Sequence, residues 1–338
     1  MEMNHNVRII KDVMIRTMIM QSQLDLRAQF GLPAIITAAG ERASFRFVEF
    51  FTANIRNQNT RESYGRAVRD FLLWCESRSL GLADLNAVIV AGYVEYLDRE
   101  CGYAKPTVKQ NLAAIRVTLD YLVSGGILNG NPASSVRGPK YSIKRGKTPV
   151  LSAEQTRQLL DSIDTTTIQG LRDRALIATM VYTFSRVSAV LGLKVEDYFP
   201  SGKRWKLRLM EKGGKYNEIY VHHNAESYLD AYIEAAGIGN DRKSPLFRSL
   251  NRRLALSERG MNRTDALRMV KKHAEGASLP CSISNHTFRA TGITTYLKNG
   301  GRIEIAQQIA GHESARTTGL YDRRDDEVSL DEIERILI

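Results

Sequence analysis

A histidine and an arginine stand three positions apart in the segment SNHTFRATGITTYL, residues 284–297, whose other side chains are mostly small or apolar. If the segment is helical, His286 and Arg289 lie on one face, because residues three apart are neighbours on a helix surface. Burying a guanidinium without an anionic partner costs more free energy than a packed helix face returns. We therefore expect this face to meet either solvent or an anion.

Four more residues could join these two in the chemistry of a phosphate group. Arg186 interrupts the apolar run YTFSRVSAVLGL, Lys212 lies at a predicted hairpin tip, and AGHESARTTGLYDRR supplies His312 and, nine residues later, Tyr321. Transfer of a phosphate to a side chain needs a nucleophile, cations, a proton donor and a base. The six residues include a candidate for each of these groups, although each could also have an ordinary structural role.

The composition favours a polyanionic partner. The chain has 338 residues, enough for two domains, and its 48 Lys and Arg against 37 Asp and Glu give a net charge of +11. Nucleic acid is therefore a more natural partner than an acidic protein, although the charge could serve solubility alone. The three cysteines favour neither a disulfide framework nor a zinc site. Because no apolar run is long enough to span a membrane, the cytoplasm is the expected location.

The first part of the chain is predicted to be an N-terminal arm followed by a helical domain. Residues 1–44 form the arm, and residues 45–133 have helical periodicity, with Asn59 expected to cap the first long helix. The last helix of this domain has a side with Lys109 and Arg116, basic and short enough to approach a DNA backbone. A solvated face is the simpler alternative.

A basic linker is predicted between the two domains. Residues 134–150, SSVRGPKYSIKRGKTPV, combine proline, glycine and serine with cations and contain no acidic residue. Because each cation that lies along DNA neutralises a phosphate and releases counterions, this charge predicts contact with DNA. The expected contacts are Arg137, Lys140, Lys144, Arg145 and Lys147.

The second domain, residues 151–338, is predicted to be mostly helical. It begins with a capping box of Ser152 and Gln155, and one apolar helix is expected over residues 171–193. Near the end of the chain, residues 329–338 carry an apolar stripe on a helix too short to fold alone, so this segment must dock on another surface.

A β-hairpin is predicted within this second domain. The segment RWKLRLMEKGGKYNEIYV, residues 204–221, alternates apolar and charged side chains on both sides of a glycine pair. The alternation indicates two strands, and the glycine pair indicates the turn between them. Lys212 and Lys215 would lie at the tip.

These motifs together resemble the tyrosine recombinase or integrase family, which includes phage integrases and Xer-type recombinases. The similarity is densest in HTFRATGITTYLKNGGRIEIAQQIAGHESARTTGLY, residues 286–321, and extends loosely over residues 45–133. It implies a mainly α fold with a small antiparallel β-sheet, an α+β arrangement, in a two-domain, C-shaped DNA clamp. The helical core-binding, SAM-like domain would come first and the catalytic domain second. The residues that carry the resemblance are Arg186, Lys212, His286, Arg289, His312 and Tyr321.

The resemblance also implies a role for each of these residues. Tyr321 would attack the scissile phosphate and form a 3′-phosphotyrosyl link, releasing a free 5′-hydroxyl. Arg186 and Arg289 would grip the phosphate oxygens, which suits the planar fork of a guanidinium. His312 would donate a further hydrogen bond to the phosphate, and His286 would assist proton transfer from the tyrosine.

The leaving oxygen also needs a proton. Lys212 would supply it, with Lys215 on the same hairpin as the alternative. Neither a metal ion nor a nucleotide cofactor is expected, because the arginines stabilise the charge and the phosphotyrosine retains the bond energy of the backbone. EKGGKY also fails as a phosphate-binding loop, since Leu209 and Tyr216 stand where a glycine and a serine or threonine are needed.

The expected partners are double-stranded DNA recombination sites, other copies of the chain and accessory DNA-bending proteins. The resemblance implies a homotetramer that exchanges its C-terminal helices and carries out site-specific recombination through a Holliday junction, for integration, excision or resolution. Two other functions remain open. One is a type IB topoisomerase-like enzyme, and the other is a non-cutting DNA-binding or architectural protein of the same fold.

The sequence departs from the family pattern at two positions. An acidic residue is common three positions after the first arginine, where this chain has Ala189, and a histidine is common where it has Ala290. The residue that orients Arg186 is therefore not identified by the motif, and Glu196 or Asp197 could form an ion pair with this arginine. Because neither alanine stands at a reacting position, we expect an active enzyme.

Overall fold

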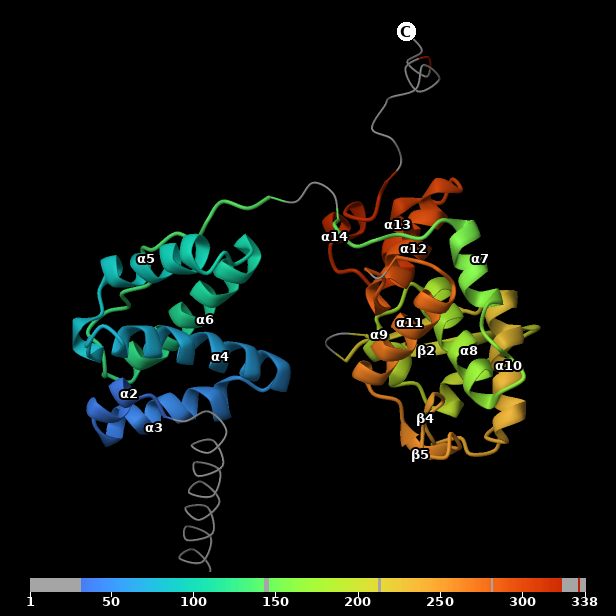
Figure 1. The fold of residues 1–338 in the computed structure, drawn as a ribbon, viewed down its shortest axis with the longest axis horizontal. Helices are drawn as coiled ribbons and strands as arrows, with labels where there is room; N and C mark the ends of the chain where they lie inside the picture. Colours follow the sequence, from blue (N-terminus) through green and yellow to red (C-terminus); the bar gives the residue numbers. More distant parts are fainter. Residues whose placement is uncertain (1–31, 143–145, 212–213, 281, 324–333, 335–338) are drawn as a thin grey trace, which may run out of the picture. The chain divides into compact units, whose positions relative to one another are not determined.

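The chain divides into two units, Met1–Ser142 and Ile143–Ile338, each with its own hydrophobic core (Figure 1). The structure, a computed structural model, describes residues 32–142, 146–211, 214–280, 282–323 and 334. The predicted DNA contacts Lys144 and Arg145, the predicted proton donor Lys212, and the predicted C-terminal helix apart from Glu334 lie outside the described residues.

The first unit is helical, as the periodicity of its sequence predicts. Asn57 caps its long helix by accepting a hydrogen bond from the Thr60 backbone N–H at 3.1 Å, so the predicted cap at Asn59 is wrong by two residues. The elements are α2 (Ala34–Ala38), α3 (Glu41–Glu49), the π-helical turn η1 (Phe50–Asn54), α4 (Gln58–Glu76), the 3₁₀ turn η2 (Leu82–Asp84), α5 (Ala87–Glu95), the π-helical turn η3 (Tyr96–Glu100) and α6 (Lys105–Ser124).

The first unit includes more of the chain at both ends than predicted. Ile35 and Ile36 are buried in its core, so the boundary placed at residue 44 is wrong, because α2 and α3 pack into the bundle. At the other end, Val136 is also buried in this core, so the first residues of the predicted linker belong to the folded unit. The Arg116 side chain fixes this end by donating to the backbone oxygens of Ala133 and Val136 at 3.1 and 2.7 Å.

The second unit is mostly helical with two small antiparallel sheets. The predicted capping box is present at its start, where Ser152 and Gln155 exchange hydrogen bonds. Its elements are α7 (Ala153–Asp161), α8 (Ile168–Thr183), α9 (Val187–Leu191), the 3₁₀ turn η4 (Val195–Asp197), β1 (Tyr198–Ser201), β2 (Arg204–Met210), β3 (Tyr216–Tyr220), α10 (His223–Ala236), β4 (Arg248–Leu250), β5 (Leu256–Gly260), α11 (Arg263–Gly276), α12 (Asn285–Lys298), α13 (Ile303–Ala310) and α14 (Ala315–Gly319).

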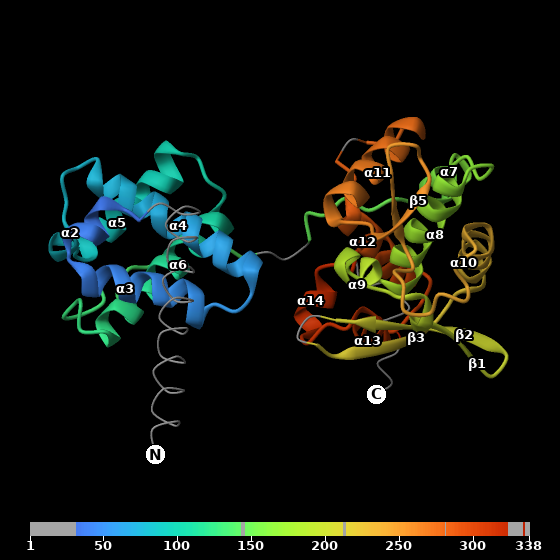
Figure 2. The ribbon, with the colours of Figure 1, turned by 90° about the horizontal axis from the view of Figure 1, so that it is seen from below.

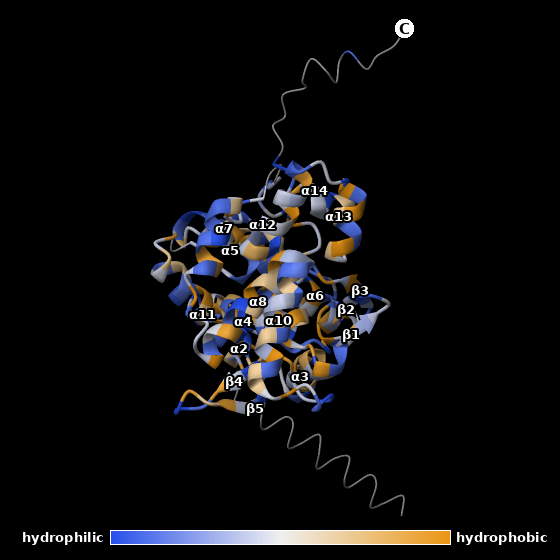
Figure 3. Ribbon diagram, turned by 90° about the vertical axis from the view of Figure 1, so that its right-hand side faces the viewer, coloured by the Kyte–Doolittle hydropathy of each residue, from blue (hydrophilic) through white to orange (hydrophobic). Residues whose placement is uncertain are grey.

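Helix α8 lies at the centre of the second unit. Most of its residues are buried, and a helix that is apolar on nearly all sides belongs in a core. It packs against both α10 and α12. Peripheral helices such as α13 carry hydrophilic and hydrophobic residues together (Figure 3). Among the described residues, none of the helices combines the length and the apolar character needed to cross a membrane.

The helix predicted over residues 171–193 is two helices. The chain leaves α8 at Phe184, which has the left-handed conformation with φ of 54°, and restarts at α9 with Arg186 as the N-terminal cap residue. A left-handed non-glycine residue is strained and persists only where its surroundings impose it. Periodicity could not reveal this break, because both segments are equally apolar.

The predicted hairpin is present, but the sheets contain more strands than expected. Strands β2 and β3 pair antiparallel with Leu207 opposite Ile219, and β1 adds to the other edge of β2. This sheet lies beside α13 (Figure 2), where the Asn217 side chain donates to the Ile309 backbone oxygen at 3.1 Å. The expectation that the rest of the domain is helical is wrong for β4 and β5, which form a second hairpin.

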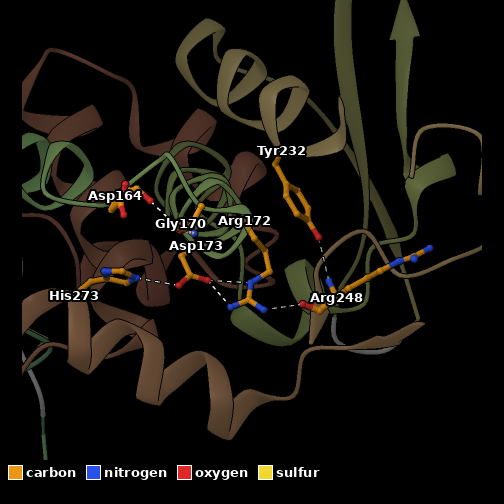
Figure 4. Close-up of polar contacts among 8 residues, drawn as sticks. Asp164, Gly170, Arg172, Asp173, Tyr232, Arg248 and His273 are labelled. Atoms are coloured by element: carbon orange, nitrogen blue, oxygen red, sulfur yellow. Dashed lines mark hydrogen bonds and ion pairs between the residues drawn. The ribbon is translucent and has the colours of Figure 1, made fainter. Parts of the chain in front are cut away.

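A buried ion pair ties three elements of the second unit together (Figure 4). Arg172 and Asp173, neighbours on α8, are 3% and 0% exposed, and two guanidinium nitrogens of Arg172 donate to Asp173 Oδ1 at 2.6 and 2.9 Å. Arg172 also donates to the Arg248 backbone oxygen on β4, and His273 Nε2 on α11 lies 2.9 Å from Asp173 Oδ2. The ion pair therefore links α8 to α11 through Asp173 and to β4 through Arg172.

Removing this carboxylate should destabilise the second unit strongly. In Asp173→Ala the buried Arg172 charge loses its anionic partner, which typically costs about 3–5 kcal/mol. Glu218→Ala is the matched control, because it removes a carboxylate that pairs with Arg208 at 42% side-chain exposure and should cost at most about 1 kcal/mol. Chemical denaturation of the full chain measures both, and equal losses in the two variants would contradict the assignment.

Candidate active site

Arg289 is the most deeply buried of the predicted site residues, at 1% exposure on α12. Its guanidinium donates to the backbone oxygen of Ala310 at 2.9 Å and to that of Phe184, and its Nε has no hydrogen-bond partner within the described part of the chain. Helix α12 approaches α8 closely at Gly292, one turn after Arg289. A Cβ at this position would lie 2.1 Å from the Val181 backbone oxygen, so a larger residue would not fit. The glycine lets α12 lie directly on the end of α8.

Arg186 is directed into the same site by the break after α8. Its Nη1 donates to Glu211 Oε2 at 2.7 Å, and 34% of its side chain is exposed. The predicted alternative, a pair with Glu196 or Asp197, is wrong. Asp197 instead accepts from the Lys194 backbone N–H, and Glu196 faces the Lys194 ammonium at 4.0 Å.

The Tyr321 hydroxyl lies 2.7 Å from His286 Nε2. Tyr321 is 7% exposed, whereas His286 is an exposed residue in the first turn of α12. The backbone of the tyrosine is held from two sides, since its N–H donates to the Thr318 oxygen and its own oxygen accepts from the buried Thr294 hydroxyl at 2.8 Å. The tyrosine and histidine predicted from distant motifs are thus in direct contact.

The end of the predicted linker also supports this tyrosine segment. The Gly146 backbone N–H donates to the Leu320 oxygen at 2.8 Å, and the Arg323 side chain donates to the backbone oxygens of Gly146 and Thr148. A Cβ on Gly146 would lie 2.7 Å from the Leu320 oxygen, so only glycine fits this contact without a shift. The linker therefore meets the chain one residue before Tyr321.

His312 interacts with both arginines and with the ring of Tyr321. It follows Gly311, whose left-handed φ of 59° ends α13, and its Nδ1 is 2.9 Å from the Thr318 hydroxyl. The ring lies nearly parallel to that of Tyr321, with centroids 5.8 Å apart. If the threonine donates to Nδ1, the proton of a neutral ring stays on Nε2 and is available to an acceptor.

The two arginines set the charge of the site. Burial, followed by the charge of Arg186, lowers the pKa of Arg289 to about 10. Burial, followed by both arginines and then His286, lowers the pKa of His312 to about 3. Although His286 as a whole residue is exposed, desolvation of its ring and then the same two arginines lower its pKa. Near pH 7 both histidines are therefore neutral next to two cations, an arrangement that favours a bound anion.

Of the two candidate lysines, Lys215 is within the described residues. Lys215 is exposed, and its backbone oxygen accepts from the Glu211 N–H at 2.8 Å. Of the predicted DNA contacts that are described, Arg116 is occupied by the backbone bonds given above. The exposed ones are Lys109, Arg137, Lys140 and Lys147.

Sequence reasoning missed three residues that support the site, namely Glu211, Thr294 and Thr318. Only Glu211 had a signal in the sequence, and it was indirect: the missing acid at Ala189 left open which carboxylate orients Arg186. Among the described residues, no cluster of three or more His, Cys, Asp or Glu side chains is arranged to hold a metal ion.

Comparisons with known proteins identify the family of the chain. The Phage integrase family profile matches residues 149–327, more than half of the chain, and the profile of the phage integrase N-terminal SAM-like domain matches residues 46–126. The fold is thus that of a tyrosine recombinase. The chain belongs to the phage integrase family, and the resemblance and the α+β fold class inferred from the sequence are confirmed.

Individual relatives cover most of the chain. Tyrosine recombinase XerC of Pelobacter propionicus is 29% identical over 82% of this chain and 87% of its own length, and tyrosine recombinase XerD of Listeria monocytogenes is 27% identical over 78% and 87%. Among solved structures, XerH bound to difH substrate in a pre-cleavage complex matches with a TM-score of 0.64 at 18% identity, over 90% of this chain and 96% of that one. A lambda integrase dimer bound to a core site matches with a TM-score of 0.63 at 16% identity, over 84% and 79%.

We expect the His312 ring to stay neutral at about pH 5, where an exposed histidine is largely protonated. NMR titration of labelled histidine side chains, assigned with His312→Gln, measures this. Because the pKa is lower in the folded than in the unfolded state, the contribution of His312 to the free energy of unfolding is present above about pH 6.5 and is lost as the pH falls toward 3. A midpoint for His312 near its ordinary value would contradict this description of the site.

Proposed function

We propose that the protein is a site-specific DNA recombinase that cuts and rejoins DNA through a covalent link between Tyr321 and a 3′-phosphate. The observation that carries this proposal is the 2.7 Å contact between the Tyr321 hydroxyl and His286 Nε2, in a site that also contains Arg186 and Arg289. The names of the relatives, tyrosine recombinases XerC and XerD, support the same activity.

Cleavage begins with the loss of the tyrosine proton. A phenol with an ordinary pKa near 10 is a weak nucleophile near pH 7, so it needs a base and a cationic environment. His286 is neutral at that pH, and its Nε2 can accept the proton as the Tyr321 oxygen forms its bond to phosphorus. The bond from phosphorus to the 5′-oxygen breaks in the same displacement, and that oxygen takes a proton from Lys212 or Lys215.

The arginines act on the charge that the displacement develops. Negative charge spreads over the equatorial phosphate oxygens in the transition state, and donors fixed before the reaction stabilise it most. Arg289 is fixed by two backbone oxygens and Arg186 by Glu211, so neither guanidinium has to reorganise. In this proposal His312 adds a neutral donor, and the two guanidiniums provide the stabilisation that a divalent ion provides in many nucleases.

Rejoining is the reverse of cleavage with a different 5′-hydroxyl. The phosphotyrosyl bond replaces a phosphodiester of similar energy, so the proposal includes neither metal nor nucleotide cofactor. Two sequential exchanges would pass through a Holliday junction in a homotetramer whose C-terminal segments dock in trans. The fold likeness to a lambda integrase tetramer bound to a Holliday junction, with a TM-score of 0.62 at 16% identity, supports this assembly.

A nicked suicide duplex that contains the cognate site tests the proposal. We expect wild-type protein to form a covalent adduct with DNA on a denaturing gel and Tyr321→Phe to form none, because the phenylalanine has no nucleophilic oxygen. His286→Ala should form the adduct roughly 10²-fold more slowly, the usual effect of losing a general base. The chain's cognate site is first selected from random duplexes by binding.

The products separate the competing functions. A branched junction would support recombination, whereas relaxation of supercoiled plasmid without strand exchange would support a topoisomerase-like enzyme. Tight binding of the selected site by wild-type protein without any covalent adduct would refute cleavage by Tyr321. The non-cutting DNA-binding protein would then be the better description.

The linker cations should contribute to DNA affinity through phosphate contacts. Each of Lys140→Gln and Lys147→Gln should reduce the slope of log affinity against log salt by about 1, because one fewer counterion is released. Lys243→Gln, which makes the same charge change outside the linker, is the control. Fluorescence anisotropy over a salt series measures the slopes, and unchanged slopes in both linker variants would exclude these phosphate contacts.

A further inference from the structure

Glu211 is a buried carboxylate that the chemistry described above does not use directly. It is 8% exposed and comes immediately after β2. Its Oε2 accepts the bond from Arg186 Nη1, and within the described part of the chain its Oε1 is buried without a hydrogen-bond partner. A half-satisfied buried carboxylate is costly, so its presence calls for a compensating benefit.

The backbone of Glu211 is hydrogen-bonded where the chain turns after β2. Its backbone N–H donates to the Lys215 oxygen at 2.8 Å, and its own oxygen accepts from the Gly214 N–H at 3.1 Å. Lys212 is the next residue in the chain. The backbone N–H and oxygen of Glu211 are therefore both paired, which fixes where its side chain begins.

Glu211 also lies against the corner that presents His312. A Cβ on Gly311 would lie 3.1 and 3.2 Å from Glu211 Cγ and Cδ, so the glycine leaves room for the glutamate side chain. The negative charge also reaches Arg289, where it raises the pKa of the guanidinium against the effects of burial and Arg186. One carboxylate thus interacts with both arginines and packs beside the histidine corner.

The residue three positions after Arg186 cannot perform this task. Ala189 is buried at 6% exposure on α9 and has no polar atom in its side chain. Similar recombinases commonly have an acidic residue at this place, as noted above. In this chain the acidic group comes from the end of β2 instead.

We propose that Glu211 is the positioning residue of Arg186 and replaces, from the hairpin, the acidic group that α9 lacks at Ala189. One bond to Nη1 fixes the guanidinium and leaves its other N–H groups for the phosphate oxygens. The carboxylate also offsets the repulsion between the two arginines before DNA arrives. This inference rests on the proposed cleavage by Tyr321.

Single-turnover cleavage of the suicide duplex tests the inference. Glu211→Gln keeps the size of the side chain and removes its charge, and we expect cleavage roughly 10²-fold slower, the scale of a misplaced catalytic group. DNA affinity should fall by no more than about threefold, because Arg186 remains present. Glu211→Asp keeps the charge but withdraws it by one methylene, so its rate should lie between those of wild type and Glu211→Gln.

Two controls separate positioning from a general structural effect. Glu218→Gln removes a carboxylate from the same hairpin, where it pairs with the exposed Arg208, and should cleave at the wild-type rate. Arg186→Lys keeps a cation that cannot form the same fork. Adding Glu211→Gln to Arg186→Lys should slow cleavage by much less than 10²-fold, because the residue that Glu211 positions is already gone.

The possible failures are distinguishable. Wild-type cleavage by Glu211→Gln, or the same loss in the Arg186→Lys background as in the wild-type background, would overturn the positioning role and leave Tyr321 chemistry intact. A wild-type protein that forms no Tyr321 adduct on its selected site would overturn the proposed function and this inference with it. Slow cleavage with retained DNA affinity and a non-additive double variant would support both.

Discussion

The site depends on burying the charge of Arg289 next to a second arginine. A buried guanidinium needs acceptors on the protein, and Arg289 takes backbone oxygens from Phe184 and Ala310. One oxygen belongs to Phe184, the left-handed residue that ends α8. The other belongs to Ala310, the last residue of α13 before the left-handed Gly311. The ends of two helices thus provide the acceptors for one guanidinium. Gly292 allows the close helix contact that completes the arrangement.

The same two cations also affect what the histidines can do. Burial, followed by the charges of Arg289 and Arg186, lowers the pKa of His286 and of His312, so both rings are neutral near pH 7. A neutral His286 can accept the Tyr321 proton, which an imidazolium could not, and the arginines stabilise the phenolate that results. In the proposed reaction, the charge that binds the phosphate therefore also favours the phenolate nucleophile and the neutral form of its base. A single electrostatic feature serves binding and proton transfer.

Local sequence patterns predicted helices and strands better than they predicted the tertiary contacts that hold those elements and the site in place. The hairpin over residues 204–221 and the capping box at Ser152 depend on neighbouring residues, and both are confirmed. The break at Phe184 and the packing of Ile35 depend on tertiary contacts, which periodicity does not contain. Motif spacing likewise identified the site side chains that the structure brings together. It could not identify Thr294 or Thr318. Their hydroxyls bond to the Tyr321 backbone and to the His312 ring, and such contacts do not require a fixed distance along the sequence from the reacting residues.

Glu211 shows why such supports escape sequence reasoning. The requirement on Arg186 is physical: a partly buried cation beside Arg289 needs a nearby carboxylate, whichever element supplies it. A reacting group must occupy one point relative to the phosphate, whereas a counter-charge can approach a guanidinium from several directions. The acidic group can therefore move from a helix to a hairpin while the reacting groups keep their spacing. The alanine at position 189 therefore indicates that the counter-charge of Arg186 comes from another element. It does not indicate that the protein is inactive.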